Sequence, residues 1–338
     1  MEISPPYLLF LGDTKDPLSV KTSRGIAEWR PEKCVGQLSM PGCEVSLGLP
    51  EIDFEEAAAK GAKTFILGLA NRGGVIAPEW LPYLKQALEL GMDIASGMHS
   101  KLADIPEIKQ LAHSLGRKIF DVRHPTVNLS VGNGIKRGGK RILAVGTDCS
   151  VGKMYTTLAI EREMKSRDLN VDFRATGQTG ILIDGGGISV DAVVADFIAG
   201  AVEMLSPDNL EDHWDVIEGQ GSLFHPSFAG VSLGLLHGAQ ADVLILCHAV
   251  GREHMRGLPH QPLPDMQNCI KANLGGARLT NPNAILGGIS INSSALPEIE
   301  AEKYCQKMAE TYGVPCVDPL RGGIAPIVDF ILSQKGKS

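Results

Sequence analysis

The clearest chemical signature in the sequence is the run GTDCSVGK at positions 146–153, which combines two glycines with a lysine. Such a run is typical of a phosphate-binding loop, because glycines let the backbone approach an anion and the lysine adds positive charge. In the usual pattern a serine or threonine hydroxyl follows the lysine and binds magnesium. Met154 takes that position here, and its thioether is a poor ligand for magnesium. The run therefore predicts a loop that binds phosphate groups without this metal ligand.

The residues around the run favour the same interpretation. An apolar stretch at 141–145 predicts a strand before the loop, and residues 153–167 predict a helix after it. A helix that begins at the loop directs its first amide groups and its positive dipole end at the anion. The alternative is an ordinary strand-to-helix turn that carries a lysine by chance. The candidate cofactor-binding residues of the loop are Gly146, Thr147, Asp148, Cys149, Ser150, Val151, Gly152, Lys153 and Met154.

Two further polar turns follow predicted strands. The turn EGQG begins at Glu218, whose carboxylate could hold a cation or accept a proton from an amine. The turn from Arg174 to Gly180 offers many hydrogen-bond donors and little bulk, which suits a pyrophosphate or a carboxylate. We expect Arg174 to contact the cofactor, and Gln178 and Thr179 to contact the substrate. The alternative for both turns is an ordinary strand-end loop.

Histidines and arginines cluster in residues 248–260, after another predicted strand. Arginine binds carboxylates through two parallel hydrogen bonds, so Arg252 and Arg256 are candidates for holding an acidic substrate. Histidine accepts protons near neutral pH, although any single histidine could instead be a hydrogen-bonded structural residue. The histidine spacing does not match a zinc site, so we expect no metal. The candidate catalytic residues are Glu218, His225, His248 and His254.

Alternating strands and helices must position these loops. In the first part we predict strands at 7–12, 64–69, 93–97 and 118–122, and helices at 54–60, 78–90 and 105–115. In the second part we predict strands at 141–145, 171–175, 214–218, 242–247, 284–291 and 315–317, and helices at 153–167, 191–205, 297–312 and 324–332. This alternation predicts an α/β fold with parallel sheets, which bind ligands at the carboxyl ends of their strands. The glycine-rich segment 124–140 predicts two domains, 1–130 and 131–338.

Composition limits the classes of partner. The chain has 338 residues, a formal net charge of −7 and no long basic block, so we expect no nucleic-acid partner. Its apolar runs are of strand length, which predicts neither a membrane span nor a signal peptide. Its 7 cysteines include no C-x-x-C pair, which favours reduced thiols in a cytoplasmic protein. We expect a small-molecule substrate and a homo-oligomer, which is common for large α/β chains.

Several motifs together resemble one family. GTDCSVGKM, RATGQTGI, DFIAGAVE, EGQGSLFHP and LLHGAQAD occur in this order, and SGMHSKL and VRHP extend the likeness to the first half. The set is similar to a bacterial and archaeal family of formerly unknown function. This resemblance implies a Rossmann-like first domain, a P-loop NTPase-like second domain and, as for some members, D-glutamate N-acetyltransferase activity with acetyl-coenzyme A. More distantly, GTDxxxGK resembles dethiobiotin synthetase, which joins a carboxylate to an amine with ATP.

These observations predict an acyl-coenzyme A-dependent N-acyltransferase that acts on an acidic amino acid, with D-glutamate implied by the resemblance. The loop would bind the pyrophosphate of the coenzyme and transfer no phosphoryl group, so Met154 would be permitted. One alternative is an ATP- and magnesium-dependent ligase or kinase of the dethiobiotin synthetase kind, in which Thr156 or Thr157 could supply a hydroxyl. Another is a non-enzymatic nucleotide-sensing regulator, which the crowding of histidine and arginine in one loop opposes.

Overall fold

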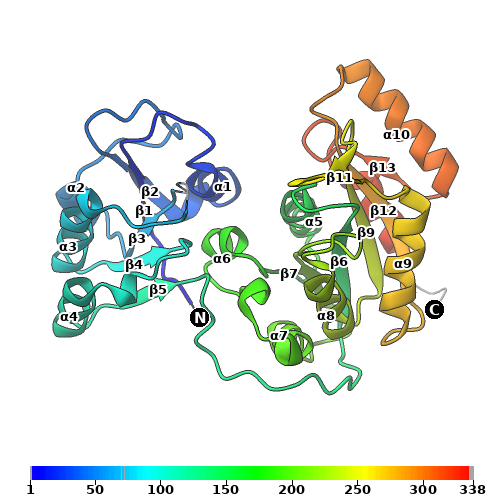
Figure 1. Cartoon of the computed structure of the whole chain (residues 1–338), viewed down its shortest axis with the longest axis horizontal. Helices are drawn as coiled ribbons and strands as arrows, with labels where there is room; N and C mark the ends of the chain where they lie inside the picture. Colours follow the sequence, from blue (N-terminus) through cyan, green and yellow to red (C-terminus); the bar gives the residue numbers. More distant parts are fainter. Residues whose placement is uncertain (1, 70, 72, 335–338) are drawn as a thin grey trace. The chain divides into compact units, whose positions relative to one another are not determined.

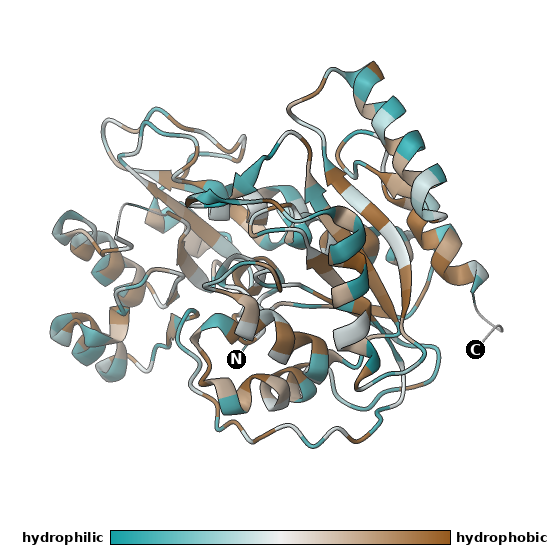
Figure 2. Cartoon of the chain, turned by 45° about the vertical axis from the view of Figure 1, so that its right-hand side comes forward, coloured by the Kyte–Doolittle hydropathy of each residue, from teal (hydrophilic) through white to brown (hydrophobic). Residues whose placement is uncertain are grey.

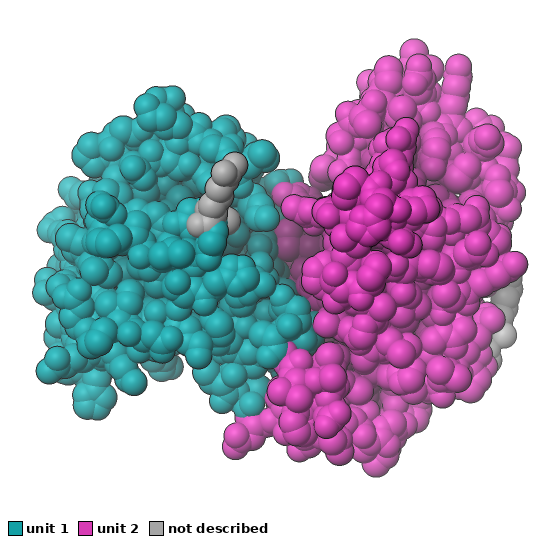
Figure 3. All heavy atoms as spheres, viewed as in Figure 1, with its two compact units in different colours: residues 1–127, 177–192 teal, residues 128–176, 193–338 magenta. Residues whose placement is uncertain are grey.

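The computed structural model describes residues 2–69, 71 and 73–334, which form two compact units. Unit 1 contains the residues up to 127 together with 177–192, and unit 2 contains 128–176 together with the residues from 193 onward (Figure 3). The junction at 127/128 lies close to the predicted domain boundary. The predicted second domain is continuous, however, whereas in the structure residues 177–192 belong to unit 1.

Unit 1 is built on a parallel sheet with the strand order β2-β1-β3-β4-β5. Its strands are β1 (Tyr7–Gly12), β2 (Cys34–Ser39), β3 (Thr64–Leu67), β4 (Asp93–Ser96) and β5 (Ile119–Asp121). Its helices are α1 (Lys21–Trp29), α2 (Phe54–Ala59), α3 (Leu81–Glu89), α4 (Pro106–Ser114) and α6 (Gln178–Asp184). A helix joins each strand to the next, which allows neighbouring strands to be parallel. Helices α2, α3 and α4 cover one face of the sheet, and α1 and α6 lie on the other (Figure 1).

Helix α6 completes unit 1 from a distant part of the sequence. It packs against α1 at Gly25, where a Cβ atom would lie only 3.1 Å from Cδ1 of Ile183. The hydroxyl groups of Thr22 and Thr179 lie 3.2 Å apart, and Ile183 is fully buried. Because a single helix covers little of a five-stranded sheet, we infer that α6 closes apolar surface beside α1. This burial explains why residues 177–192 belong to unit 1.

Unit 2 is built on a second parallel sheet, with the strand order β13-β12-β9-β6-β8-β7. Its strands are β6 (Lys140–Gly146), β7 (Val171–Arg174), β8 (Trp214–Ile217), β9 (Val243–Ala249), β12 (Ile285–Asn292) and β13 (Cys316–Val317), and a hairpin is formed by β10 (His254–Met255) and β11 (Leu258–Pro262). Its helices are α5 (Lys153–Ser166), α7 (Ile198–Leu205), α8 (Ala229–Ala239), α9 (Met266–Arg278), α10 (Glu298–Tyr312) and α11 (Ala325–Ser333). Figure 2 shows the apolar colour that runs along the strands of this sheet. Strand β6 therefore lies in a buried, central position between β9 and β8.

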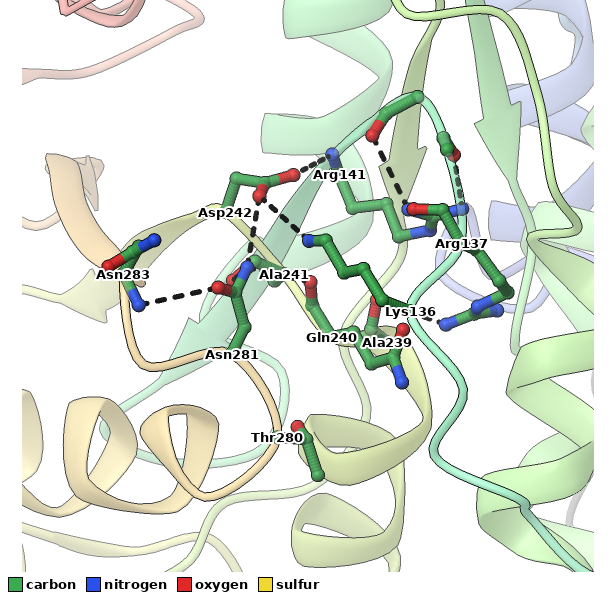
Figure 4. Close-up of polar contacts among 12 residues, drawn as sticks. Lys136, Arg137, Arg141, Ala239, Gln240, Ala241, Asp242, Thr280, Asn281 and Asn283 are labelled. Carbon is green, nitrogen blue, oxygen red and sulfur yellow. Dashed lines mark hydrogen bonds and ion pairs between the residues drawn. The ribbon is translucent and has the colours of Figure 1, made fainter. Parts of the chain in front are cut away.

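Two buried arginines fix the start of β6 (Figure 4). The guanidinium of Arg137 donates to the carbonyl groups of Glu203 and Ser206 at the end of α7, and to that of Gly238 at the end of α8. The last carbonyl groups of a helix have no partner within the helix, and the negative end of its dipole attracts a cation. Arg141, which is fully buried, donates from Nη1 to the carbonyl of Arg137 at 3.2 Å. The segment before β6 is thereby attached to the ends of two helices.

Asp242 fastens the same end of the sheet from the neighbouring strand (Figure 4). Its carboxylate accepts the amide of Arg141 at 2.8 Å and Nδ2 of Asn281 at 2.9 Å. Asn281 also donates to the carbonyl of Gln240 at 3.1 Å. The first residues of β6 and β9 and the turn before β12 are thus held together at the amino ends of the strands, which leaves the carboxyl ends for the candidate loops.

Most predicted strands and helices are confirmed to within a few residues, and β1 has the predicted bounds. The sequence prediction missed β2, β10, β11, α1, α6, α8 and α9. Helix α8 reads AGVSLGLLHGA, in which glycines disfavour a helix and apolar residues leave no clear polar face. The helix predicted at 191–205 begins only at Ile198, after the short 3-10 helices η4 (Val190–Ala192) and η5 (Ala195–Phe197). Further 3-10 helices are η1 (Pro31–Lys33), η2 (Pro78–Trp80) and η3 (Leu102–Asp104).

Within the part of the chain that the structure describes, no helix combines the length and the apolar character needed to cross a membrane.

We predict that Ile183→Ala destabilises unit 1 by about 2–5 kcal/mol, the usual cost of truncating a buried isoleucine. Urea unfolding followed by tryptophan fluorescence would measure the change. Ile299→Ala is the matched control, because Ile299 is 67% exposed and its truncation should leave stability almost unchanged. Equal stability of both variants would contradict the structural role given to α6.

Candidate functional site

The predicted loop connects β6 to α5 at the carboxyl end of the central strand of unit 2. Strands β8 and β9 flank β6, so Glu218 and His248 reach the same edge of the sheet as the loop. The hairpin β10–β11 follows β9 and brings Arg252 and Arg256 to the loop. Ligands of open parallel sheets bind at this edge. The structure therefore brings together most of the residues that the sequence singled out.

The backbone of the loop is arranged to receive an anion. Among the described residues, none accepts a hydrogen bond from the amides of Ser150, Val151 and Gly152. The same holds for the amide of Lys153, which begins α5. Consecutive amide groups without acceptors at a helix amino end form an anion-binding nest. The run GTDCSVGK differs in spacing from the usual pattern G-x-x-x-x-G-K, because five residues, one more than usual, separate Gly146 from Gly152.

The side chain of Lys153 points back into the loop. It is only 7% exposed, and its Nζ donates to the carbonyl of Asp148 at 2.9 Å. Burial lowers the pKa of Lys153, and neighbouring groups that include Asp148 and Glu218 oppose this shift. Because an ammonium group has three donors, two N–H groups of Lys153 have no acceptor among the described residues. An anion in the nest would supply those acceptors.

A buried carboxylate joins the loop to the hairpin segment. Asp148 is fully buried, and its Oδ1 accepts the amide of Cys149 at 2.7 Å. Its Oδ2 accepts Nη1 of Arg252 and the amide of Arg256, both at 2.8 Å. The guanidinium of Arg256 also contacts Oγ of Ser150. Both arginines therefore lie against the loop, and with Lys153 they surround it with positive charge.

The hydroxyl groups after the loop are already engaged. Oγ1 of Thr156 donates to the carbonyl of Gly152 at 2.9 Å, and Oγ1 of Thr157 donates to that of Lys153 at 3.0 Å. Both side chains are buried against α5 and its neighbours. A shifted loop that uses Thr156 as a magnesium ligand is disfavoured, because its oxygen also contacts Oγ of Ser290 at 2.7 Å and accepts Sγ of Cys247 at 3.4 Å. Met154 offers no hydroxyl at the usual position.

Glu218 is buried beside the loop at the end of β8. Its Oε2 accepts the amide of Thr176 at 2.9 Å, and its carbonyl accepts Oγ1 of the same threonine at 2.7 Å. The next residue is Gly219, where a Cβ atom would lie 1.7 Å from the carbonyl oxygen of Ala144 and 2.9 Å from Cδ of Lys153. Only glycine allows this close approach, which explains one of the glycines in the EGQG turn. Thr176 is a site residue that the sequence analysis did not select.

The three candidate histidines occupy different environments. Nδ1 of His248 lies 3.1 Å from Oγ1 of Thr147, and its ring stacks with that of Tyr304. Burial and the charge of Arg252 lower the pKa of His248 to about 4, so its ring is neutral at neutral pH. His254 is exposed at the start of the hairpin.

The ring of His225, in contrast, is committed to backbone contacts. Its Nδ1 accepts the amide of Ser227 at 3.2 Å, and its Nε2 lies 3.2 Å from the carbonyl of Arg256. These contacts assign the proton to Nε2, which donates to that carbonyl. His225 therefore supports the hairpin segment and has no nitrogen left to accept a substrate proton.

Three predicted residues have other structural surroundings in the units to which they belong. Arg174 donates to Asp215 at 2.7 Å and to Asp172 at 3.1 Å, so its guanidinium is part of an ion-pair network between β7 and β8. Gln178 and Thr179 begin α6 and belong to unit 1. The spacing of these residues in the sequence gave no sign that the chain leaves unit 2 after residue 176.

Two groups of side chains have the composition of metal sites. Asp148, Cys149 and His225 each bring a ligand atom within 4.8 Å of the others, but the carboxylate is shared with Arg252 and Lys153 lies nearby. Burial raises the pKa of Cys149, which keeps its thiol protonated. The second group, Asp172, His213 and Asp215, contains the guanidinium of Arg174. Resident cations thus occupy both groups and oppose a metal ion.

Comparisons with known proteins agree with this architecture. Residues 38–125 match the model of the N-terminal Rossmann-like domain of DUF1611, a domain of unknown function, and residues 130–328 match the model of its C-terminal P-loop domain. A DUF1611 family protein from Anabaena variabilis has a crystal structure with a TM-score of 0.83 and 31% identity, covering 98% of this chain and 100% of that one.

Two curated relatives are similar over almost their whole length. A protein of a Pseudoalteromonas species named D-glutamate N-acetyltransferase is 54% identical over 97% of this chain and 99% of its own. A protein of the same name from Tritonibacter scottomollicae is 53% identical over the same shares of the two chains. With its Rossmann-like and P-loop units and these relatives, the chain belongs to the DUF1611 family.

Proposed function

We propose that the protein is a D-glutamate N-acetyltransferase that uses acetyl-coenzyme A as the acetyl donor. Two relatives that carry this name share more than half of their residues with the chain over nearly its full length. The observation in the structure that supports the donor is the anion-binding loop, which has free amides, a lysine and two arginines but no magnesium hydroxyl. A cytoplasmic location and a homo-oligomer remain predictions from the sequence.

In this proposal the loop binds the pyrophosphate of the coenzyme. The amides of Ser150 to Lys153 and the ammonium of Lys153 donate hydrogen bonds, and Arg252 and Arg256 add charge at the rim. Charge neutralisation by side chains makes a metal ion unnecessary, because no phosphoryl group is transferred. Arg174 plays no part in this binding, since its guanidinium is paired with two carboxylates elsewhere.

The acceptor must lose a proton before its nitrogen attacks the thioester carbonyl, and two groups at the carboxyl edge can take that proton. One is the carboxylate of Glu218, buried at the end of β8. The other is the imidazole of His248, which is neutral at neutral pH but a weak base, because burial lowers its pKa to about 4. The remaining candidates are less suitable, because both nitrogens of His225 are engaged and His254 is exposed on the hairpin. We therefore assign the general base to Glu218 and keep His248 as the second candidate.

A magnesium-dependent ligase is the second candidate function, and the buried carboxylate of Glu218 near Lys153 is the observation in its favour. The contacts of Asp148 and Thr156 oppose it, because their oxygen atoms already have protein partners.

We predict that Lys153→Ala weakens the binding of coenzyme A at least tenfold, or by about 1.4 kcal/mol, because it removes a buried cation from the nest. Isothermal titration calorimetry would give the dissociation constants. Lys271→Ala, which changes an exposed lysine on α9, is the control and should bind like the original protein. If Lys153→Ala bound coenzyme A as well as the control does, the loop would not be the coenzyme site.

Metal dependence separates the two candidate functions. We expect acetyl transfer to D-glutamate to persist in excess EDTA, and ATP to remain unhydrolysed, because side chains supply the charge that magnesium provides in phosphoryl transfer. Met154→Thr restores the usual hydroxyl and should not raise the rate of acetyl transfer. Product formation that requires magnesium and consumes ATP in step would support the ligase instead.

The low pKa of His248 predicts a specific dependence of stability on pH. Its pKa is about 4 in the folded protein, whereas an unperturbed histidine has a value of about 6.5. As the pH falls from about 6.5 to about 4, the unfolded chain binds a proton at His248 and the folded protein does not. The folded state therefore loses stability over this pH range. His248→Gln removes the titrating group, so its free energy of unfolding should fall less than that of the original protein between these two values. Urea unfolding at several pH values tests this, with the exposed His254→Gln as control; identical pH slopes for all three proteins would show that His248 is not buried as described.

A further inference from the structure

The guanidinium of Arg252 donates hydrogen bonds to a side chain and to two carbonyl groups of the phosphate loop. Its Nη1 donates to Oδ2 of Asp148 at 2.8 Å and to the carbonyl of Cys149 at 2.6 Å. Its Nη2 donates to the carbonyl of Ser150 at 3.1 Å. One side chain thus holds two successive carbonyl groups of the loop, and both hydrogens of Nη1 are used in doing so.

Holding these carbonyl groups also fixes the amides that an anion would contact. A trans peptide is planar, and its C=O and N–H groups point in opposite directions. When the carbonyl of Cys149 is held outward, the amide of Ser150 must point inward. In the same way, the outward carbonyl of Ser150 turns the amide of Val151 inward. These are the first two amides in the series that has no acceptor among the described residues.

The backbone at Ser150 needs such support, because it adopts a strained conformation. Its φ is 51°, in the left-handed region that residues other than glycine rarely occupy. This conformation costs about 1–2 kcal/mol for a residue with a Cβ atom, and it persists only where surrounding contacts impose it. Arg252 holds the carbonyl of Ser150, and Arg256 contacts its hydroxyl. Both contacts come from the segment that Asp148 fastens to the loop.

From these contacts we infer that Arg252 is a positioning residue, which Asp148 orients and which holds the loop amides toward the bound anion. This differs from the prediction that Arg252 binds a substrate carboxylate. The side chain is 25% exposed, and its hydrogen-bond partners among the described residues all lie in the loop itself. The inference rests on the proposed function only in taking coenzyme A as the natural source of the anion.

The test measures anion binding in the full-length protein with two probes, coenzyme A and inorganic pyrophosphate. Arg252→Gln should weaken both by about tenfold, because a neutral amide cannot replace three charge-assisted hydrogen bonds. The affinities of Arg252→Lys should lie between those of the original protein and those of Arg252→Gln. A lysine keeps the positive charge beside Asp148 but lacks the planar guanidinium that binds several acceptors at once. Arg278→Gln is the matched control: this exposed arginine on α9 also donates to a backbone carbonyl, and its loss should leave binding unchanged.

A second substitution at Ser150 distinguishes positioning from direct contact. Added to Arg252→Gln, Ser150→Gly should recover binding by about fivefold, because glycine adopts the left-handed conformation without the usual cost. Ser150→Ala removes the same hydroxyl but keeps the Cβ atom, so it should recover nothing. Equal affinities of the two double variants would overturn the inference.

Steady-state kinetics provides the other decisive outcome. If Arg252→Gln binds both probes normally and raises only the KM for D-glutamate, Arg252 contacts the acceptor and the inference is wrong. Failure of the original protein to bind coenzyme A, with pyrophosphate binding retained, would count against the proposed donor alone, and pyrophosphate would still test the role of Arg252. If the original protein bound neither coenzyme A nor pyrophosphate, the proposed donor and the inference about Arg252 would both be wrong.

Discussion

The buried carboxylate of Asp148 is the interaction on which the site of unit 2 depends. A fully buried charge must be neutralised and hydrogen-bonded, and Asp148 meets this demand with the amides of Cys149 and Arg256 and the guanidinium of Arg252. These three donors come from the loop and from the segment after β9. The carboxylate therefore determines that the two segments meet, and it places two arginines beside Lys153. The positive charge beside the loop thus comes from side chains of the chain itself.

The two ends of the parallel sheet in unit 2 carry different kinds of polar network. At the amino ends of the strands, Arg137 and Arg141 satisfy carbonyl groups of helix ends and of the segment before β6, and Asp242 joins neighbouring strands. Both terminal nitrogens of Arg137 and all three nitrogens of the Arg141 guanidinium find acceptors within the protein, although Nε of Arg137 is buried without one. At the carboxyl ends, the amides of the loop and two N–H groups of Lys153 find no acceptor among the described residues. These unmatched donors are the reason that we propose this end as the ligand-binding one.

Unit 1 shows how packing can overrule the order of the chain. Residues 177–192 follow β7 of unit 2, yet Ile183 is buried against α1, where Gly25 leaves room for it. Apolar surface beside α1 can be buried only by an element from elsewhere in the chain, and α6 supplies it. Gln178 and Thr179 therefore belong to a helix of unit 1, whereas the phosphate loop belongs to unit 2.

The sequence by itself determined the α/β class, the position of the loop between β6 and α5, and the missing hydroxyl at Met154, because strand and helix periodicity and loop composition are local properties. Only the tertiary structure decided which polar residues converge. Arg252 and Arg256 lie about a hundred residues after the loop, and their contacts depend on the pairing of β9 with β6. Arg174 lies in a polar turn after a strand, as a site residue would, but its guanidinium is paired with the carboxylates of Asp215 and Asp172 on β8 and β7. The sequence did not predict helix α8, or helix α6 and its place in unit 1. The stability of both helices comes from burial against distant elements and not from local helix preference.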